Sequence, residues 1–301
     1  MTHAYRDNEA KHTHTHTHNK IVVKAENSSF SLGKKSQSAM EYLMTYGWAV
    51  LIIAVVLVAL FQMGVFNSAN FAPKAQPGSC QVFKTVAATS LEGTCNNELP
   101  QYVAQFDGAT STVISTVQST TLPIFTLSVW VNPTGTNPDS GVMSYGEVLF
   151  SASTSITRFC PDTSLYCLGY TYSFANKFTN IVAVWNYNTG TGDIYVNGAL
   201  ATSGSYSDNA MAFTTYTLGD WSTIYYGGQM ANVQIYNTSL SANDIKSLYY
   251  EGIGGAPQNT QNLVGWWPLN GNANDYSGNN NNGAAVNVVY TGSWEEGYSQ
   301  P

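Results

Sequence analysis

The chain contains 301 residues with a formal net charge of −7, and this composition argues against some classes of protein. Between residues 85 and 301 there are three basic side chains, Arg158, Lys177 and Lys246, and fourteen acidic ones, which gives a net charge of −11. Because phosphate contacts need a basic face, we do not expect nucleic acid as a partner. An acidic surface rich in Asn and Thr suits solubility outside the cell.

Residues 1–36 are polar and lack the periodicity of a helix or strand, so we interpret them as a cytoplasmic leader without a fold of its own. Within this leader, His alternates with Thr over residues 12–18. Histidine tracts can bind metal, but alternating histidines in an unfolded tail do not form a closed site. A solvated tail or a mispredicted start codon is the simpler interpretation.

A long uncharged apolar run extends from Gly47 to Phe66. A helix of about 20 residues crosses the ~30 Å hydrocarbon core of a membrane. Lysines are concentrated before the run, at positions 20, 24, 34 and 35, which predicts a single-pass membrane protein with a cytoplasmic N-terminus and an extracellular C-terminal domain. A cleaved secretory signal is the alternative, but its apolar region would be shorter, and no small-residue cleavage site follows Phe66.

The motif QSAME at residues 37–41, followed by YLMTYGWA at 42–49, resembles the class III signal peptides of archaeal type IV pilin-like proteins. In that family a prepilin peptidase cuts before the glutamine. The resemblance therefore implies a cut between Ser36 and Gln37, a mature transmembrane or assembly helix over residues 37–66, and other pilin-like subunits as partners. The family usually has Gly before the cut, where this chain has Ser36.

Glu41 is the candidate assembly residue, because it would be the fifth residue of the mature chain. A carboxylate at the mouth of a membrane helix is costly to bury unless a cation meets it. The new ammonium group of Gln37 on a neighbouring subunit would be such a cation. Alternatively, Glu41 lies in the first turn of a helix, where the helix dipole favours an anion by up to about 1 kcal/mol.

Beyond a linker at residues 67–79, residues 80–301 read as a single all-β ectodomain large enough to bury its own core. Runs rich in Val, Ile, Thr and aromatic residues alternate with clusters of Gly, Asn, Pro and Ser. The clearest strands are predicted at 125–131, 148–151, 181–187, 193–196 and 230–236. Asn197 and Gly198 predict a two-residue hairpin turn, because both residue types tolerate positive φ.

Four segments in a fixed order resemble the laminin-G-like, concanavalin A-like sandwich family: QFDGATSTV at 105–113, FTLSVWVNP at 125–133, GDIYVNGAL at 192–200, and GGQMANVQIYNTSLSANDIKSLYY at 227–250. The resemblance implies an antiparallel two-sheet jelly-roll sandwich. Many members of the family bind glycans or other proteins, which implies an extracellular glycan or protein ligand here.

The segment LVGWWPLNGNANDYSGNNNNGAA at 263–285 resembles the part that normally opens this domain, although here it comes last. A circular permutation explains this order, since the termini of a domain often lie close together at its surface. The alternative is a second domain cut short, which would leave under about 40 residues to fold alone.

Four cysteines follow the apolar run, at Cys80, Cys95, Cys160 and Cys167, as expected in an oxidising exterior. We favour the local pairs Cys80–Cys95 and Cys160–Cys167, because the two groups lie far apart in sequence. A zinc site lacks the usual tight spacing between its cysteines. Free buried thiols are a further alternative.

The candidate ligand-binding residues are Trp221, Tyr225 and Tyr226, in the glycine-flanked loop at 219–228. Amphipathic aromatic side chains can stack on sugar faces. By contrast, Trp130 and Trp185 lie in alternating strands with apolar neighbours, which predicts that they belong to the core.

Calcium is the candidate cofactor, with Asn274, Asp275 and Asn280 as its ligands and Ser277 and Asn279 beside them. Hard cations take oxygen ligands of this kind, and relatives that the chain resembles often hold calcium in this region. Against calcium, no second carboxylate lies nearby, and Asn-Gly runs make ordinary turns without a metal.

We expect no catalysis. Glycan hydrolysis needs two carboxylates across the scissile bond, whereas the acids here are scattered. Glu147 and Asp220 are a pair that could meet in space. A Ser-His-Asp triad is excluded from the ectodomain, because every histidine lies in the leader. Asn237 begins an acceptable N-glycosylation sequon.

These features predict a pilin-like cell-surface protein that is anchored by its helix or assembled into a filament, and that displays a sandwich for adhesion. The first alternative is a membrane-anchored lectin that never polymerises. The second is a tethered glycan hydrolase.

Overall fold

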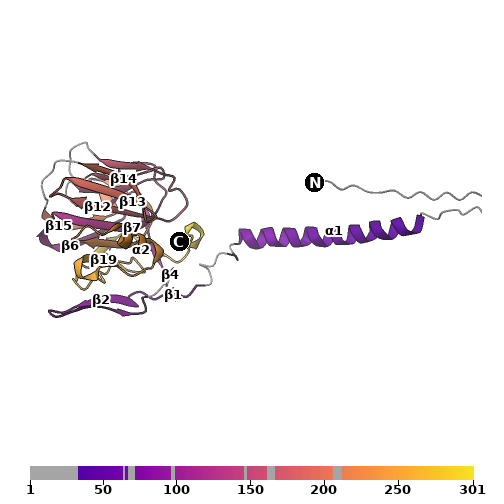
Figure 1. Ribbon diagram of the computed structural model, residues 1–301, viewed down its shortest axis with the longest axis horizontal. Coiled ribbons are helices and arrows are strands. Elements are labelled where there is room, and N and C mark those ends of the chain that lie inside the picture. Colours follow the sequence, from indigo (N-terminus) through magenta and orange to yellow (C-terminus); the bar gives the residue numbers. More distant parts are fainter. Residues whose placement is uncertain are drawn as a thin grey trace, which may run out of the picture. The chain divides into compact units, whose positions relative to one another are not determined.

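The computed structural model describes residues 33–63, 65–66, 72–95, 99–145, 148–160, 167–205 and 212–301. The chain divides into two units, residues 1–59 and 60–301, of which the second contains the sheets (Figure 1). We call residues 72–301 the head. The histidine tract lies outside the described residues.

Helix α1 (Gly33–Gln62) covers the apolar run. Its segment Met40–Gln62 has a mean hydropathy of 2.5 with none of its residues buried, and is long and apolar enough to cross a membrane. The helix begins at Gly33, so the last residues of the predicted leader are helical. Its first turn contains no acidic residue, because Glu41 lies further along. The dipole interpretation of Glu41 is therefore wrong for the uncut chain.

The head is built mainly from strands, with one α-helix. Among its described residues, the helices are α2 (Ala242–Tyr250) and two short 3-10 helices, Thr260–Asn262 and Glu295–Gly297. The first eleven strands are β1 (Lys74–Ala75), β2 (Cys80–Lys84), β3 (Thr89–Gly93), β4 (Leu99–Pro100), β5 (Val103–Asp107), β6 (Thr112–Thr121), β7 (Ile124–Pro133), β8 (Gly141–Tyr145), β9 (Val148–Ala152), β10 (Ile156–Cys160) and β11 (Leu168–Thr171). The others are β12 (Thr179–Asn186), β13 (Thr191–Val196), β14 (Ala199–Ser205), β15 (Ala212–Leu218), β16 (Asp220–Trp221), β17 (Ile224–Tyr225), β18 (Gly227–Tyr236), β19 (Leu263–Trp267), β20 (Gly283–Val286) and β21 (Val289–Thr291).

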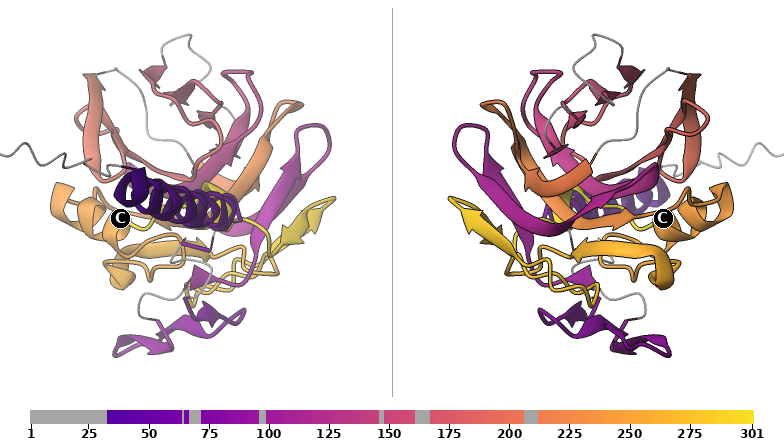
Figure 2. Two further views of the ribbon diagram at one scale, coloured as in Figure 1. Left: turned by 90° about the vertical axis from the view of Figure 1, so that its right-hand side faces the viewer. Right: turned by 90° about the vertical axis from the view of Figure 1, so that its left-hand side faces the viewer.

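Two antiparallel sheets form the sandwich, as the sequence predicts (Figure 2). The smaller sheet has seven strands in the order β11-β10-β9-β8-β15-β6-β20. The larger has eight, in the order β14-β13-β12-β7-β18-β5-β21, with β19 paired to β18. The main apolar core contains side chains from both sheets, among them Phe125 and Trp185 of the larger sheet and Phe150 and Tyr216 of the smaller.

Strand β12 shows why the larger sheet is buried on both faces. Ile181, Ala183 and Trp185 point into the main core, while Val182 and Val184 belong to a second apolar cluster on the opposite face. That cluster includes side chains of helix α2, whose first turn is fixed by a reciprocal capping box. Because both faces are covered, the strand reads as a continuous apolar run.

The turn at Asn197 and Gly198 joins β13 to β14, and both residues have positive φ, 50° and 74°. This is the hairpin that the sequence predicts.

The C-terminal segment completes both sheets. Strand β19 pairs with β18 in the larger sheet, β21 pairs with β5 at its edge, and β20 pairs with β6 in the smaller sheet. The segment at 263–285 is thus part of the sandwich, which is the placement that a circular permutation predicts.

Strands β2 and β3 form an N-terminal hairpin, residues 80–93, that belongs to neither large sheet (Figure 1). The backbone N–H of Val82 donates to the carbonyl of Tyr276 at 2.8 Å. The ammonium of Lys84 donates to the carbonyl of Leu263 at 2.5 Å. Just before the hairpin, Lys74 and Ala75 pair with β4, so the head extends into the predicted linker. Such a two-residue pairing leaves no alternation to find in a sequence.

Candidate functional site

The predicted aromatic loop forms a small hairpin from β16 and β17. Trp221 pairs with Ile224, and Asp220 pairs with Tyr225. Paired residues lie on the same side of a hairpin and successive residues on opposite sides. Trp221 and Tyr225 therefore point to opposite faces, and both are half-buried. They cannot together form one flat surface for a sugar.

The turn of this hairpin carries backbone strain. Ser222 and Thr223 have φ values of 49° and 73°, which is unusual for any residue with a side chain and most of all for a β-branched one. The carboxylate of Asp220 accepts from the backbone N–H of Thr223 at 3.0 Å, which helps to hold the turn. The backbone of Gly141 packs closely against Trp221: a Cβ added to Gly141 would lie 2.8 Å from the Cβ of Trp221.

Tyr226, the third predicted aromatic, is not available to a ligand. Its side chain is fully buried in the main core, and its hydroxyl donates to the carbonyl of Gln229 at 2.9 Å. Burial raises the pKa of this hydroxyl well above its ordinary value. The prediction for Tyr226 was wrong because successive residues of a strand point to opposite faces, and here Tyr225 is half-buried while Tyr226 points into the core. Trp130 and Trp185 are buried as predicted.

Asp275 organises the predicted calcium loop through its own hydrogen bonds. One carboxylate oxygen accepts from the backbone N–H groups of Trp266 and Ser277, each at 2.9 Å. The other accepts from the hydroxyl of Ser277 and the backbone N–H of Asn281, each at 2.8 Å. Four donors thus occupy the positions that a cation would need.

Asn274 and Asn280 do not complete a calcium site around this carboxylate. Both are exposed, and Asn280 has a φ of 58°, typical of an ordinary asparagine turn. Among the described residues, no group of three His, Cys, Asp or Glu side chains is placed to hold a metal. Calcium stays an untested prediction that the geometry of Asp275 does not fit.

The remaining sequence-predicted residues are dispersed over the chain. The structure contains the disulfides Cys80–Cys95 and Cys160–Cys167, which are the pairs that the sequence favours. Asn237 is exposed at the end of β18, as glycosylation requires. Glu147 lies outside the described residues, so its position relative to Asp220 is not tested. Ser36 and Gln37 lie in α1, and nothing in the structure tests cleavage between them.

A polar pocket of about 380 Å³ opens where the larger sheet ends, at a place that the sequence does not indicate. Its lining residues come from distant parts of the chain: Asn132, Asn176, Gln229, Ser293, Trp294, Glu296 and Gly297. Asn132 and Gln229 are neighbours in register on β7 and β18, and the amide of Asn132 donates to that of Gln229 at 3.3 Å. Side-chain amides and hydroxyls that both donate and accept suit a ligand rich in hydroxyl groups.

The C-terminal 3-10 helix forms the other wall of this polar pocket. The N–H of Phe178 donates to the carbonyl of Gly297 at 2.6 Å, which fixes the helix to the loop before β12. Gly297 lies directly over Asn132, since an added Cβ would come within 2.8 Å of its amide nitrogen. Glu296 is the one charged residue among those lining the pocket.

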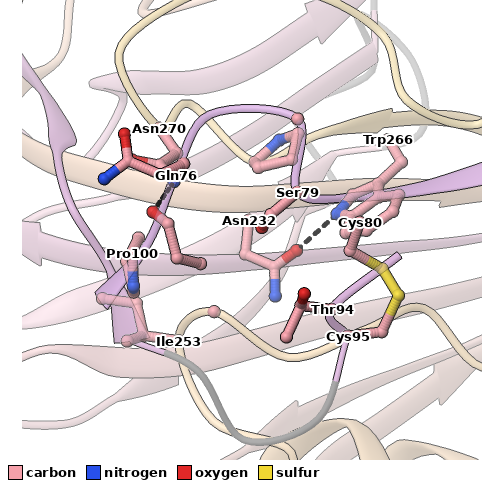
Figure 3. Close-up of a pocket in the computed structure, with 14 residues that line it drawn as sticks. Gln76, Ser79, Cys80, Thr94, Cys95, Pro100, Asn232, Ile253, Trp266 and Asn270 are labelled. Carbon is pink, nitrogen blue, oxygen red and sulfur yellow. Dashed lines mark hydrogen bonds between the residues drawn. A yellow bond between two sulfur atoms is a disulfide. The ribbon is translucent and has the colours of Figure 1, made fainter. Parts of the chain in front are cut away.

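A second cavity lies beneath the segment that leads into the N-terminal hairpin (Figure 3). Its walls include the disulfide Cys80–Cys95 and the buried pair Asn232 and Trp266, whose indole N–H donates to the Asn232 side chain at 2.8 Å. With a volume of about 30 Å³ it has room for water but none for a sugar.

Residues 107–246 match the family model of the concanavalin A-like lectin/glucanases superfamily, Laminin_G_3. The head has a concanavalin A-like, laminin-G-like fold. No curated protein matches the chain. The match begins in β5 and ends in α2, so the N-terminal hairpin and the C-terminal wall of the polar pocket lie outside it.

Solved structures share this fold at low sequence identity. A candidate carbohydrate-binding protein from Bacteroides ovatus is 15% identical with a TM-score of 0.52, over 69% of this chain and 65% of that protein's length. A native heptameric SAP-like pentraxin from Limulus polyphemus is 11% identical with a TM-score of 0.47, over 63% of this chain and 94% of its own. At 15% identity, the likeness to the Bacteroides ovatus protein shows the fold alone.

Proposed function

We propose that this protein is a pilin-like surface adhesin, in which α1 anchors or assembles the chain and the concanavalin A-like head binds a carbohydrate. The polar pocket carries the proposal for the head. Asn132, Gln229 and Ser293 offer neutral groups that donate and accept hydrogen bonds, in an open pocket of about 380 Å³. Vicinal sugar hydroxyls need such paired donors and acceptors.

The helix supports the other half of the proposal. Its apolar side chains are exposed on every side, for example Leu51 at 53% and Phe61 at 75%. Such a helix needs lipid around it, or other apolar helices packed against it in a filament core. The motif around the proposed cut before Gln37 favours a helix that can move from the lipid membrane into the core of a filament.

Glycan binding is tested with the full-length chain in detergent on a glycan array. We expect one class of glycan to bind, and the double variant Asn132→Ala/Gln229→Ala to lose at least about tenfold in affinity, because buried hydrogen bonds to a ligand contribute about 1 kcal/mol or more each. Asn188→Ala removes an exposed amide elsewhere and serves as the matched control. Binding only to proteins would contradict the carbohydrate half of the proposal.

Assembly is tested in the native cell. Filaments are sheared from the cells and pelleted, and the chain is detected and sequenced from its N-terminus. We expect it in the filament pellet, beginning at Gln37. If it occurs only in the membrane fraction, it is an anchored lectin that does not polymerise. A terminus beyond residue 66 would show a secreted head and would remove the basis of the pilin-like assignment.

A further inference from the structure

Among the described residues, three of the five basic side chains of the head have no ionic partner, and two of these three lie beside tyrosines. Of its five basic side chains, Lys74 and Arg158 form ion pairs, with Glu295 and Asp139 respectively. Lys84 donates to a backbone carbonyl. Among the described residues, Lys177 and Lys246 meet no carboxylate within ion-pair distance.

Each of these lysines lies over a tyrosine ring. The ammonium of Lys177 is 4.4 Å from the ring centre of Tyr172, and that of Lys246 is 5.8 Å from the ring centre of Tyr250. A contact of this kind is weak at an exposed site, so it does not prevent the ammonium from meeting an anion.

The two lysine–tyrosine pairs belong to one surface. The Tyr170 and Tyr172 rings stack with their centres 6.2 Å apart, and the Tyr249 and Tyr250 rings are 5.5 Å apart. Tyr249 stacks on Trp130 with the ring centres 5.8 Å apart, in the same apolar cluster as Phe178, the residue after Lys177, and this packing links the two halves.

We call this row the tyrosine–lysine surface; it consists of Tyr170, Tyr172, Lys177, Lys246, Tyr249 and Tyr250. Tyr250 is 58% exposed, and Tyr170, Tyr172 and Tyr249 are partly exposed. Asn176, which lines the polar pocket, immediately precedes Lys177, so the surface begins next to that pocket.

We propose that the tyrosine–lysine surface binds an acidic polysaccharide, with sugar rings on the tyrosines and carboxylate groups at Lys177 and Lys246. This inference rests on the proposal that the head binds carbohydrate, and it specifies the class of carbohydrate. Tyrosine rings present an apolar face and a polar edge, as a sugar does. On a head that is strongly acidic elsewhere, two unopposed cations mark the place where an anionic chain can approach.

The test compares alginate, a polymer of uronic acids, with neutral dextran and with polyglutamate, using the full-length chain in detergent. We expect alginate to bind at low salt, and Lys177→Gln/Lys246→Gln to weaken it by about tenfold with a shallower salt dependence. Tyr250→Ala should weaken alginate binding by a similar factor without changing the salt dependence. Arg158→Gln is the control, because it removes one positive charge outside this surface.

The outcomes separate this inference from the function on which it rests. Binding of dextran or another neutral glycan without alginate overturns the acidic ligand and leaves the carbohydrate function standing. Binding of polyglutamate as tight as that of alginate, with Tyr250→Ala unchanged, indicates an acidic protein partner and also overturns the inference. Equal loss in Arg158→Gln would show a general charge effect with no dedicated surface.

Discussion

Helix α1 and the core of the head contain the same kinds of apolar side chain in opposite environments. In the core, Ile181 and Trp185 are fully buried. In the helix, Trp48 is 66% exposed and Val55 is 60% exposed. The head buries its apolar side chains against one another, whereas the apolar side chains of the helix stay exposed and can be covered by lipid or by other subunits.

This contrast separates the stability of the head from the location of the protein. Substitutions in the core should affect unfolding of the head and leave membrane association unchanged. Substitutions in the helix should do the reverse. Tryptophan and valine occur in both regions, so the same change can be made twice.

The largest effect is expected in the core. Trp185→Ala removes a fully buried indole that contacts the rings of Phe159 and Tyr187 at 5.5 and 5.7 Å between centres. It should lower the free energy of unfolding by about 3–5 kcal/mol. Urea unfolding of the full chain in detergent, followed by circular dichroism, measures the loss. Trp48→Ala in the helix is the matched control, and an equal loss there would break the comparison.

The next effect concerns location. Val55→Asp places a carboxylate in the middle of α1 and should cost about 2.5–3.5 kcal/mol of membrane insertion. Fractionation of cells should show the chain shifted out of the membrane, with the urea midpoint of the head unchanged. Val289→Asp changes a valine of similar exposure, 63%, in the head and should leave the chain in the membrane.

The sequence predicts the parts of this molecule whose signals are local. Runs rich in β-branched and aromatic residues locate β7, β12 and β18 to within a few residues, and Asn197-Gly198 predicts its turn because the chemistry lies in two residues. Both disulfides join cysteines close in sequence. The apolar helix follows from length and composition alone.

The candidate site is less predictable, because it is assembled from segments far apart in the chain. The polar pocket combines β7, β18 and the last residues, and each position alone is an ordinary surface Asn, Gln or Ser. Tyr226 shows the opposite failure, since its glycine neighbours suggest a loop while its ring belongs to the core. Strand β21 pairs with β5, and β20 pairs with β6. These pairings join segments far apart in the chain, so no short stretch of sequence predicts them.

The N-terminal hairpin extends the comparison to a part of the head that depends on few apolar contacts. The double variant Cys80→Ser/Cys95→Ser opens a loop with a sequence separation of 15 and should cost up to about 3 kcal/mol of stability. Cys160→Ser/Cys167→Ser opens a shorter loop, with a separation of 7, and should cost less. Urea unfolding under oxidising conditions measures both, and the reverse order would contradict the loop-length argument.

The smallest effect is expected at the ion pair between Lys74 and Glu295, which joins the start of the head to its C-terminal 3-10 helix. Burial raises the pKa of Glu295, but the hydrogen bonds from Lys74 and from backbone N–H groups lower it more. The pKa of Glu295 therefore lies below its ordinary value of 4.5. A lowered pKa in the folded state means that the carboxylate stabilises the head above pH 4.5, and that this contribution is lost as the pH falls below it.

Glu295→Gln should therefore lower the stability of the head by less than about 1 kcal/mol at neutral pH, since water screens Lys74, whose side chain is 29% exposed. The difference between the variant and the original chain should shrink as the pH falls through about 4 and the carboxylate becomes protonated. Urea unfolding at pH values from about 3 to 7 measures this difference. A constant difference over that range would show that Glu295 acts through its shape and its neutral hydrogen bonds.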